Sequence, residues 1–176
     1  MYVFCRDEFN EIVGLFKPVF HTLMLIWKHS AYYAQPTRIV TLMREICNSL
    51  IEKAMAAGEG LHQKEPQEAV DTLRTILKVL GTFKSFYFEY KARLSEEAPD
   101  RQWKVQNGAL FGRLDEFMER VHAVLEVNLT SLQFSKLGGD RGIEIGGTKG
   151  LPKTIRIDAE TPGHLLLLLG PCCLWT

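Results

Sequence analysis

The stretch Ile26–Asn48, IWKHSAYYAQPTRIVTLMREICN, decides the fold. Proline is excluded from helix interiors but suits the first turn, so Pro36 predicts a tight joint at Ala34–Gln35. Apolar residues recur at helical spacing on both sides of this joint. They are Val19, Phe20, Leu23, Ile26 and Trp27 before it, and Ile39, Leu42, Met43, Ile46, Leu50 and Ile51 after it. We therefore predict a helical hairpin with a large aromatic seam, which the remaining helices cover.

Three further segments show the apolar periodicity of amphipathic helices, and short polar connectors separate them. Because every helix has one apolar face, the simplest arrangement is an all-α fold, an elongated antiparallel helical bundle. The expected helices are Phe9–Phe16, ending near Pro18; Pro66 to about Leu94, with Gly81 as a candidate bend; and residues 103–136, interrupted near Asn107–Gly108.

The character of the chain changes after Leu137. Six glycines crowd the next segment, and Ile143–Ile145 is its only strand-like piece. We therefore expect a helical domain over residues 1–136, a Gly-rich turn segment over 137–150, and a divergent, disordered tail over 151–176.

Composition narrows the class of partner. Apolar residues make up 46% of the 176 residues and charged residues 24%, which is typical of a globular chain. Basic and acidic residues balance at 21 each, so we expect neither a nucleic acid nor an anionic membrane as partner. The five leucines Leu165–Leu169 are far shorter than the roughly 20 residues of a membrane span. Charges at Arg6, Asp7 and Glu8 do not suit a signal peptide.

No catalytic, cofactor-binding or metal-binding residues are predicted. In the Gly-rich segment, Thr148 precedes Lys149, which is the wrong order for a phosphate-binding loop. His29 and Ser30 are adjacent on a helix and point about 100° apart, so they do not form a nucleophile and its base. The four cysteines and five histidines lack metal-ligand spacing. Cys47 lies on an apolar stripe and is predicted to be a core residue.

The run Trp27–Tyr33, followed by Arg38–Val40 and Glu45–Asn48, resembles the first tail region of dynein heavy chains, especially the axonemal ones. The resemblance covers about residues 16–150. It continues through Phe83, Trp103, Phe111–Leu114, Phe117, Arg120, Phe134, Lys136–Leu137 and Glu144–Gly150. Two departures stand out: Gly138–Gly142 is inserted before the Glu-Ile-Gly-Gly turn, and residues 151–176 do not continue the pattern. This suggests a fragment or an alternative transcript product.

The resemblance implies a mechanical role in a stack of helical bundles. It implies association with other dynein heavy chains and with intermediate and light chains, in the cytoskeleton of the ciliary axoneme. Force generation in this family belongs to the AAA+ ring and the microtubule-binding stalk, neither of which this sequence contains. The resemblance therefore implies no enzyme activity, no cofactor, and no ATP or microtubule binding by this segment itself.

The candidate interaction residues are Trp27, Tyr32, Tyr33 and Arg38 at the hairpin joint, and internal packing is an equally good interpretation of them. One alternative function is a small helical enzyme or ligand-binding bundle that uses the aromatic seam as a pocket. A second alternative is a truncated product without independent function.

Overall fold

The computed structural model describes residues 6–101 and 103–138, and within these ranges it contains helices, turns and connectors but no strand. The all-α prediction is confirmed. The elements are α1 (Arg6–Glu11), α2 (Val13–His29), α3 (Pro36–Ala57), the 3₁₀ turn η1 (Leu61–Gln63), α4 (Pro66–Glu97), the 3₁₀ turn η2 (Pro99–Arg101) and α5 (Asn107–Gly138). The strand-like piece and the tail over 151–176 lie outside the described residues.

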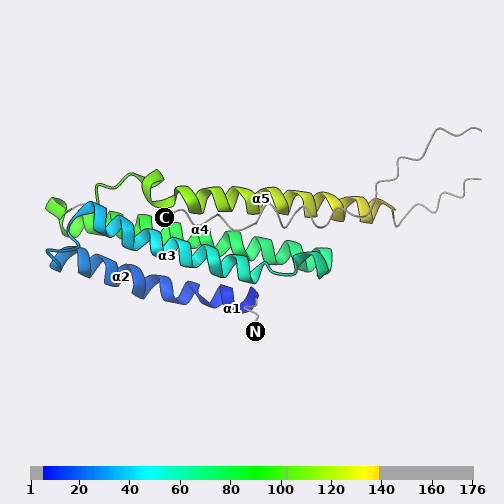
Figure 1. Ribbon diagram of the computed structural model, residues 1–176, viewed down its shortest axis with the longest axis horizontal. Coiled ribbons are helices and arrows are strands. Elements are labelled where there is room, and N and C mark those ends of the chain that lie inside the picture. Colours follow the sequence, from blue (N-terminus) through cyan, green and yellow to red (C-terminus); the bar gives the residue numbers. More distant parts are fainter. Residues whose placement is uncertain (1–5, 102, 139–176) are drawn as a thin grey trace, which may run out of the picture.

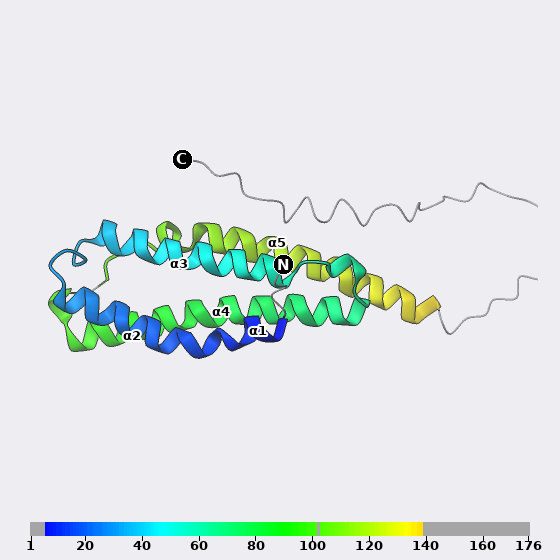
Figure 2. The ribbon, with the colours of Figure 1, turned by 60° about the horizontal axis from the view of Figure 1, so that its bottom comes forward.

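The long helices form an elongated bundle (Figure 1). The long helices α2, α3, α4 and α5 alternate in direction along the chain, as predicted, and α4 and α5, with 32 residues each, are about 48 Å long. The main contacts join α2 to α4, α4 to α5, and α5 to α3. Neighbours α2 and α4 therefore run in the same direction, as do α3 and α5 (Figure 2). The α2–α3 side of the bundle is its most open side.

The aromatic seam lies around α4, not inside the α2–α3 hairpin where we expected it. Phe83 of α4 is fully buried, with its ring centroid 5.3 Å from that of Phe16 and 5.0 Å from that of Phe20. On the other side of α4, Tyr87 packs edge-on against Phe111 of α5 at 5.0 Å. An apolar stripe shows that a helix has a buried face, but it does not say which helix covers that face.

The expected end of the first helix near Pro18 is wrong, because α2 runs through this proline. Proline removes one helical hydrogen bond, here to the carbonyl of Gly14. Gly14 is exposed, so water can hydrogen-bond to its carbonyl in place of the missing N–H. Phe16 and Phe20, on either side of the proline, are both buried. Burying each ring stabilises the fold by about 1.5–3 kcal/mol, which offsets the local cost of the proline.

The last helix begins at the predicted interruption, not at Trp103. Trp103 lies in the connector between α4 and α5, where it is buried and stacks on Tyr87 with ring centroids 5.7 Å apart and planes 8° apart. The helix α4 continues without a break through Gly81 to Glu97. Trp103 therefore anchors the connector to the core beside α4.

Candidate interaction surfaces

The structure separates the four residues proposed at the hairpin joint. Trp27 is only 4% exposed and belongs to the core. Tyr32 is 59% exposed, whereas Tyr33 and Arg38 are half-buried. The two tyrosine rings meet edge to face, 5.0 Å apart. Of the four, Tyr32 alone presents a large exposed aromatic surface.

Arg38 holds the hairpin joint together. Its guanidinium carbon lies 3.6 Å from the centroid of the Tyr32 ring, and its Nη1 donates to the Tyr32 carbonyl at 3.1 Å. The backbone N–H of Tyr33 donates to Ser30 Oγ at 3.3 Å, within the turn that follows α2. A cation stacked on an exposed ring contributes about 0.5–1 kcal/mol. The joint therefore favours this orientation of the Tyr32 ring.

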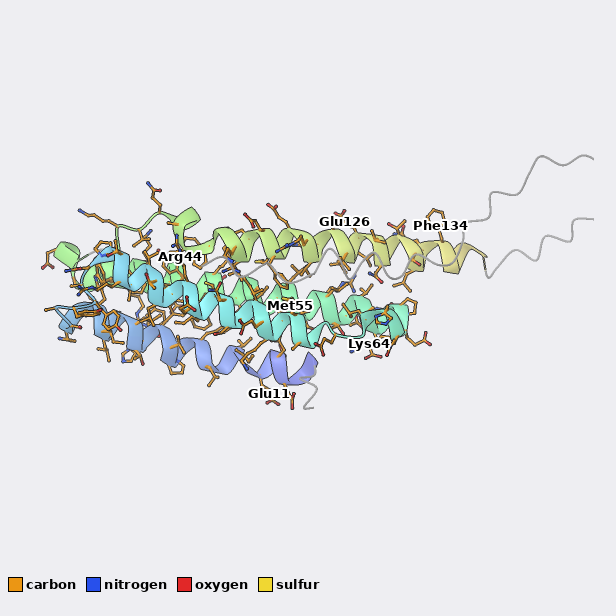
Figure 3. All side chains as sticks on the ribbon, viewed as in Figure 1. Glu11, Arg44, Met55, Lys64, Glu126 and Phe134 are labelled. Carbon is orange, nitrogen blue, oxygen red and sulfur yellow. The ribbon has the colours of Figure 1, made fainter. Side chains whose placement is uncertain are left out.

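Polar contacts tie the helices together at their edges. Lys28 of α2 pairs with Glu97 of α4, and the hydrogen bond and charge of Lys28 lower the pKa of the Glu97 carboxyl. Lys84 of α4 lies 2.6 Å from Asp115 of α5. Arg44 of α3, labelled in Figure 3, extends toward the start of α5, where its Nε donates to the Ala109 carbonyl at 2.6 Å. These contacts align the long helices.

Burial holds Cys47 and Tyr87 in their neutral forms. Burial raises the pKa of the Cys47 thiol to about 12, with a smaller contribution from Asp115 that Lys84 opposes. Burial likewise raises the pKa of Tyr87 to about 12. A nucleophilic cysteine needs a lowered pKa, so Cys47 is the core residue that was predicted. Among the described residues, no cluster of three or more His, Cys, Asp or Glu side chains could hold a metal ion.

Two adjoining hollows along the open side of the bundle form an apolar trough. We call it the α2–α3 trough. Their volumes are about 540 Å³ and 480 Å³, and both are lined by Leu15, Val19 and Ile46. One hollow extends toward Glu8, Glu11 and Lys53, and the other toward Ile26 and Leu42. Most of the trough lining is apolar, and its charged side chains line only the first hollow.

Residues Glu8–His29 are long and apolar enough to cross a membrane by length and composition alone. The same property is found in core helices of bundles. In this chain, one face of α2 is buried in the core through Phe16, Phe20, Leu23, Met24 and Trp27. Burial in the bundle accounts for only part of this apolar surface, and the expectation of no membrane partner stays a prediction.

Sequence reasoning proposed the exposed Tyr32 as an interaction residue, but it did not predict that Leu15, Leu25 and Phe134 are exposed. Leu15 and Leu25 on α2 are 59% and 41% exposed, and Phe134 on the projecting end of α5 is 69% exposed (Figure 3). Leu15 and Leu25 lie off the buried stripe of α2, which is the signal that could have identified them. Exposed apolar residues that gather on one helix mark candidate contact surfaces.

These features define an elongated helical-bundle segment with a filled aromatic core and apolar side chains exposed along its edges. Comparison with known proteins gives the family. Residues 2–158 match the family described as "Dynein heavy chain, N-terminal region 1". The chain belongs to the dynein heavy chain family and lies within this N-terminal region. The match confirms the resemblance noted over residues 16–150, and it extends into the segment 151–176.

The relatives are much longer proteins. The "Dynein beta chain, flagellar outer arm" of Chlamydomonas reinhardtii is 53% identical over 146 residues, which are 82% of this chain and 3% of that protein. The "Dynein axonemal heavy chain 11" of Sus scrofa is 33% identical over 151 residues, and the "Dynein beta chain, ciliary" of Heliocidaris crassispina is 31% identical over 149 residues. These cover 82% and 81% of this chain, and 3% of each relative.

Proposed function

We propose that this chain is a non-catalytic assembly segment of a dynein heavy chain tail. In this role it associates with other heavy chains and with intermediate and light chains in the ciliary axoneme. The observation that carries the proposal is the family match over residues 2–158, together with relatives whose names place them in flagella and cilia.

The form of the fold supports an associative role. Its aromatic seam is filled by side chains from α2, α4 and α5, and its buried thiol and phenol are held in their neutral forms. Apolar residues that remain at the surface, such as Tyr32 and Leu15, are instead available for contact with other proteins. On this proposal the purified chain neither hydrolyses ATP nor sediments with microtubules.

Affinity capture tests the proposal. The tagged chain is incubated with an extract of ciliated cells, and recovered dynein intermediate and heavy chains are detected with antibodies. The wild-type chain should recover both. Tyr32→Ala should lower recovery at least about fivefold if the exposed ring is a contact residue. Recovery no greater than with the tag alone would contradict the assembly role.

Two further variants show whether a loss of recovery is specific to the Tyr32 ring. Arg38→Ala removes the guanidinium that stacks on Tyr32 but keeps the Tyr32 ring itself. An intermediate loss of recovery would show that the orientation of the ring matters. Val127→Ala changes a residue on α5 that is also exposed, at 54%, but lies on a different helix. This variant should recover dynein chains like the wild type.

A further inference from the structure

The α2–α3 trough is an open channel with apolar groups on its walls and at its base. Leu15 and Val19 of α2 form one wall, and Ile46 of α3 forms the other. The buried rings of Phe16 and Phe83 line the first hollow from the core. A segment that lies in the trough is therefore contacted by two helices and by the core beneath them.

Outside the described residues, the sequence contains an unbroken apolar run, the five leucines Leu165–Leu169. In an extended segment successive side chains point to opposite faces, so this run is apolar on both faces. In a helix it would be apolar all round. A contact with one flat surface would leave half of these leucines in water, whereas a channel with two walls takes up both faces.

The length of the run matches the length of the trough. Five extended residues span about 17 Å. Along α2, the stretch from Leu15 to Ile26, which lines the second hollow, also spans about 17 Å. The run therefore has the dimensions to fill the apolar part of the trough from one end to the other.

The end of α5 is close enough for the run to reach the trough. Arg44 of α3 donates to the Ala109 carbonyl of α5, which places these two residues at the same level of the bundle. Counted from this level, Gly138 lies about 30 Å beyond Lys53, a residue of the first hollow. Crossing two helices adds about 20 Å sideways, so the direct distance is about 35 Å. Residues 139–164 span up to about 85 Å when extended.

The direction of approach fixes the orientation of the run. The first hollow, with Glu11 and Lys53, is at the end of the trough that is nearer to the end of α5, because α3 and α5 run in the same direction. Leu165 therefore enters at this end, and the run continues along α2 toward Ile26. This orientation brings His164 to the exposed Glu11, whose carboxylate can accept a hydrogen bond from the imidazole.

The covalent connection favours this segment over any separate molecule. A linker long enough to span the distance gives the run a local concentration at the trough of about millimolar. A second chain or another protein reaches such a concentration only when it is itself present at about millimolar levels. At micromolar protein, the segment of the same chain is therefore the favoured occupant.

We propose that Leu165–Leu169 occupies the α2–α3 trough of its own chain. Other proteins then reach Leu15 and the trough walls only by displacing this run, whereas Tyr32 and Leu25 stay accessible. The run thereby acts as a built-in cover for one apolar surface of the bundle. The proposal goes beyond the assembly role and does not depend on it.

Photocrosslinking of the purified full-length chain tests the occupant directly. Benzoylphenylalanine in place of Leu167 should crosslink, within the monomer, to residues 15–26 of α2 or 42–53 of α3. The yield should be the same at about 5 µM and after a further tenfold dilution, because the contact is intramolecular. Crosslinks found only in a dimer, or only outside these two ranges, would overturn the proposal, as would a run that forms no crosslink.

Two leucines of α2 provide a matched pair of variants. Leu15 lines both hollows, so Leu15→Ser should lower the crosslinking yield at least about threefold. Leu25 lies on the same helix and is also exposed, but it lines neither hollow. Leu25→Ser should leave the yield unchanged, and equal losses for the two variants would contradict a site in the trough.

Binding of a dye that is fluorescent on exposed apolar surface gives a second test, in which the sign of the change decides. Leu166→Ser combined with Leu168→Ser should raise the bound-dye fluorescence at least about twofold, because the trough is uncovered. If the run instead lay free in solvent, removing two of its leucines would lower the fluorescence. A decrease would therefore refute the proposal. These measurements use the purified chain alone, so a failure to recover dynein chains would refute only the assembly role.

Discussion

Replacing Phe83 by alanine should destabilise the whole bundle, because this residue joins three helices. Its ring is fully buried and lies 5.3 Å from Phe16 and 5.0 Å from Phe20 on α2, and 6.5 Å from Phe111 on α5. Truncating a buried phenylalanine to alanine costs about 3–5 kcal/mol through lost burial and the cavity left behind. The total stability of a domain is about 5–15 kcal/mol, so this loss is a large fraction.

Thermal unfolding and urea unfolding, both followed by circular dichroism, measure the effect. For a chain of this size, each kcal/mol corresponds to about 2–4 °C in Tm, so Phe83→Ala should lower Tm by about 10 °C. Phe88 is the matched control because it lies on the same helix but is 44% exposed. Phe88→Ala should cost about 1 kcal/mol or less. Equal losses for the two variants, or a loss below about 1 kcal/mol for Phe83→Ala, would refute a core centred on α4.

Three further predictions follow from single residues. Pro18→Ala should raise the free energy of unfolding by about 1–2 kcal/mol, because alanine restores the N–H that can bond the Gly14 carbonyl; a decrease in urea unfolding would show that the proline is required. The pKa of the Cys47 thiol is raised from 9.0 to about 12 in the folded chain, so the unfolded chain loses this proton first. The contribution of this thiol to the free energy of unfolding should therefore be fully present below pH 9 and should be lost as pH rises toward 12, with a loss of about 1–2 kcal/mol at pH 10. Urea titrations of Cys47→Val should show most of this pH dependence removed. Arg38→Ala should lower the free energy of unfolding by about 0.5–1 kcal/mol and should speed amide hydrogen exchange at residues 30–35. Unchanged exchange would contradict the stabilising contact of Arg38 with Tyr32.

The sequence predicted where the helices lie along the chain better than it predicted which helices pack against one another. The helix from Pro66 was identified from an apolar stripe, and it is observed from Pro66 to Glu97. Periodicity reports one face of one helix, so it could not show that Phe83 packs against Phe16 and Phe20, far away in sequence. At Pro18 a local rule gave the wrong helix end, because it ignored the burial of the flanking phenylalanines.

The candidate interaction residues show the same limit. Aromatic composition selected Trp27 and Tyr32 together, but Trp27 shares its helix face with the buried Leu23, whereas Tyr32 lies beyond the end of α2. Arg38 was proposed as a partner-facing charge, and its guanidinium stacks on the ring of Tyr32 in the same chain. Whether the hairpin joint contacts a partner stays a prediction.

We propose that this chain acts by joining a dynein assembly. The most direct measurement is a sucrose gradient of the salt extract of axonemes, prepared from ciliated cells that express the tagged chain. We predict that the tagged chain co-migrates with dynein heavy chains. A tagged chain that is absent from the extract, or that migrates only as a small species apart from those heavy chains, would contradict this role.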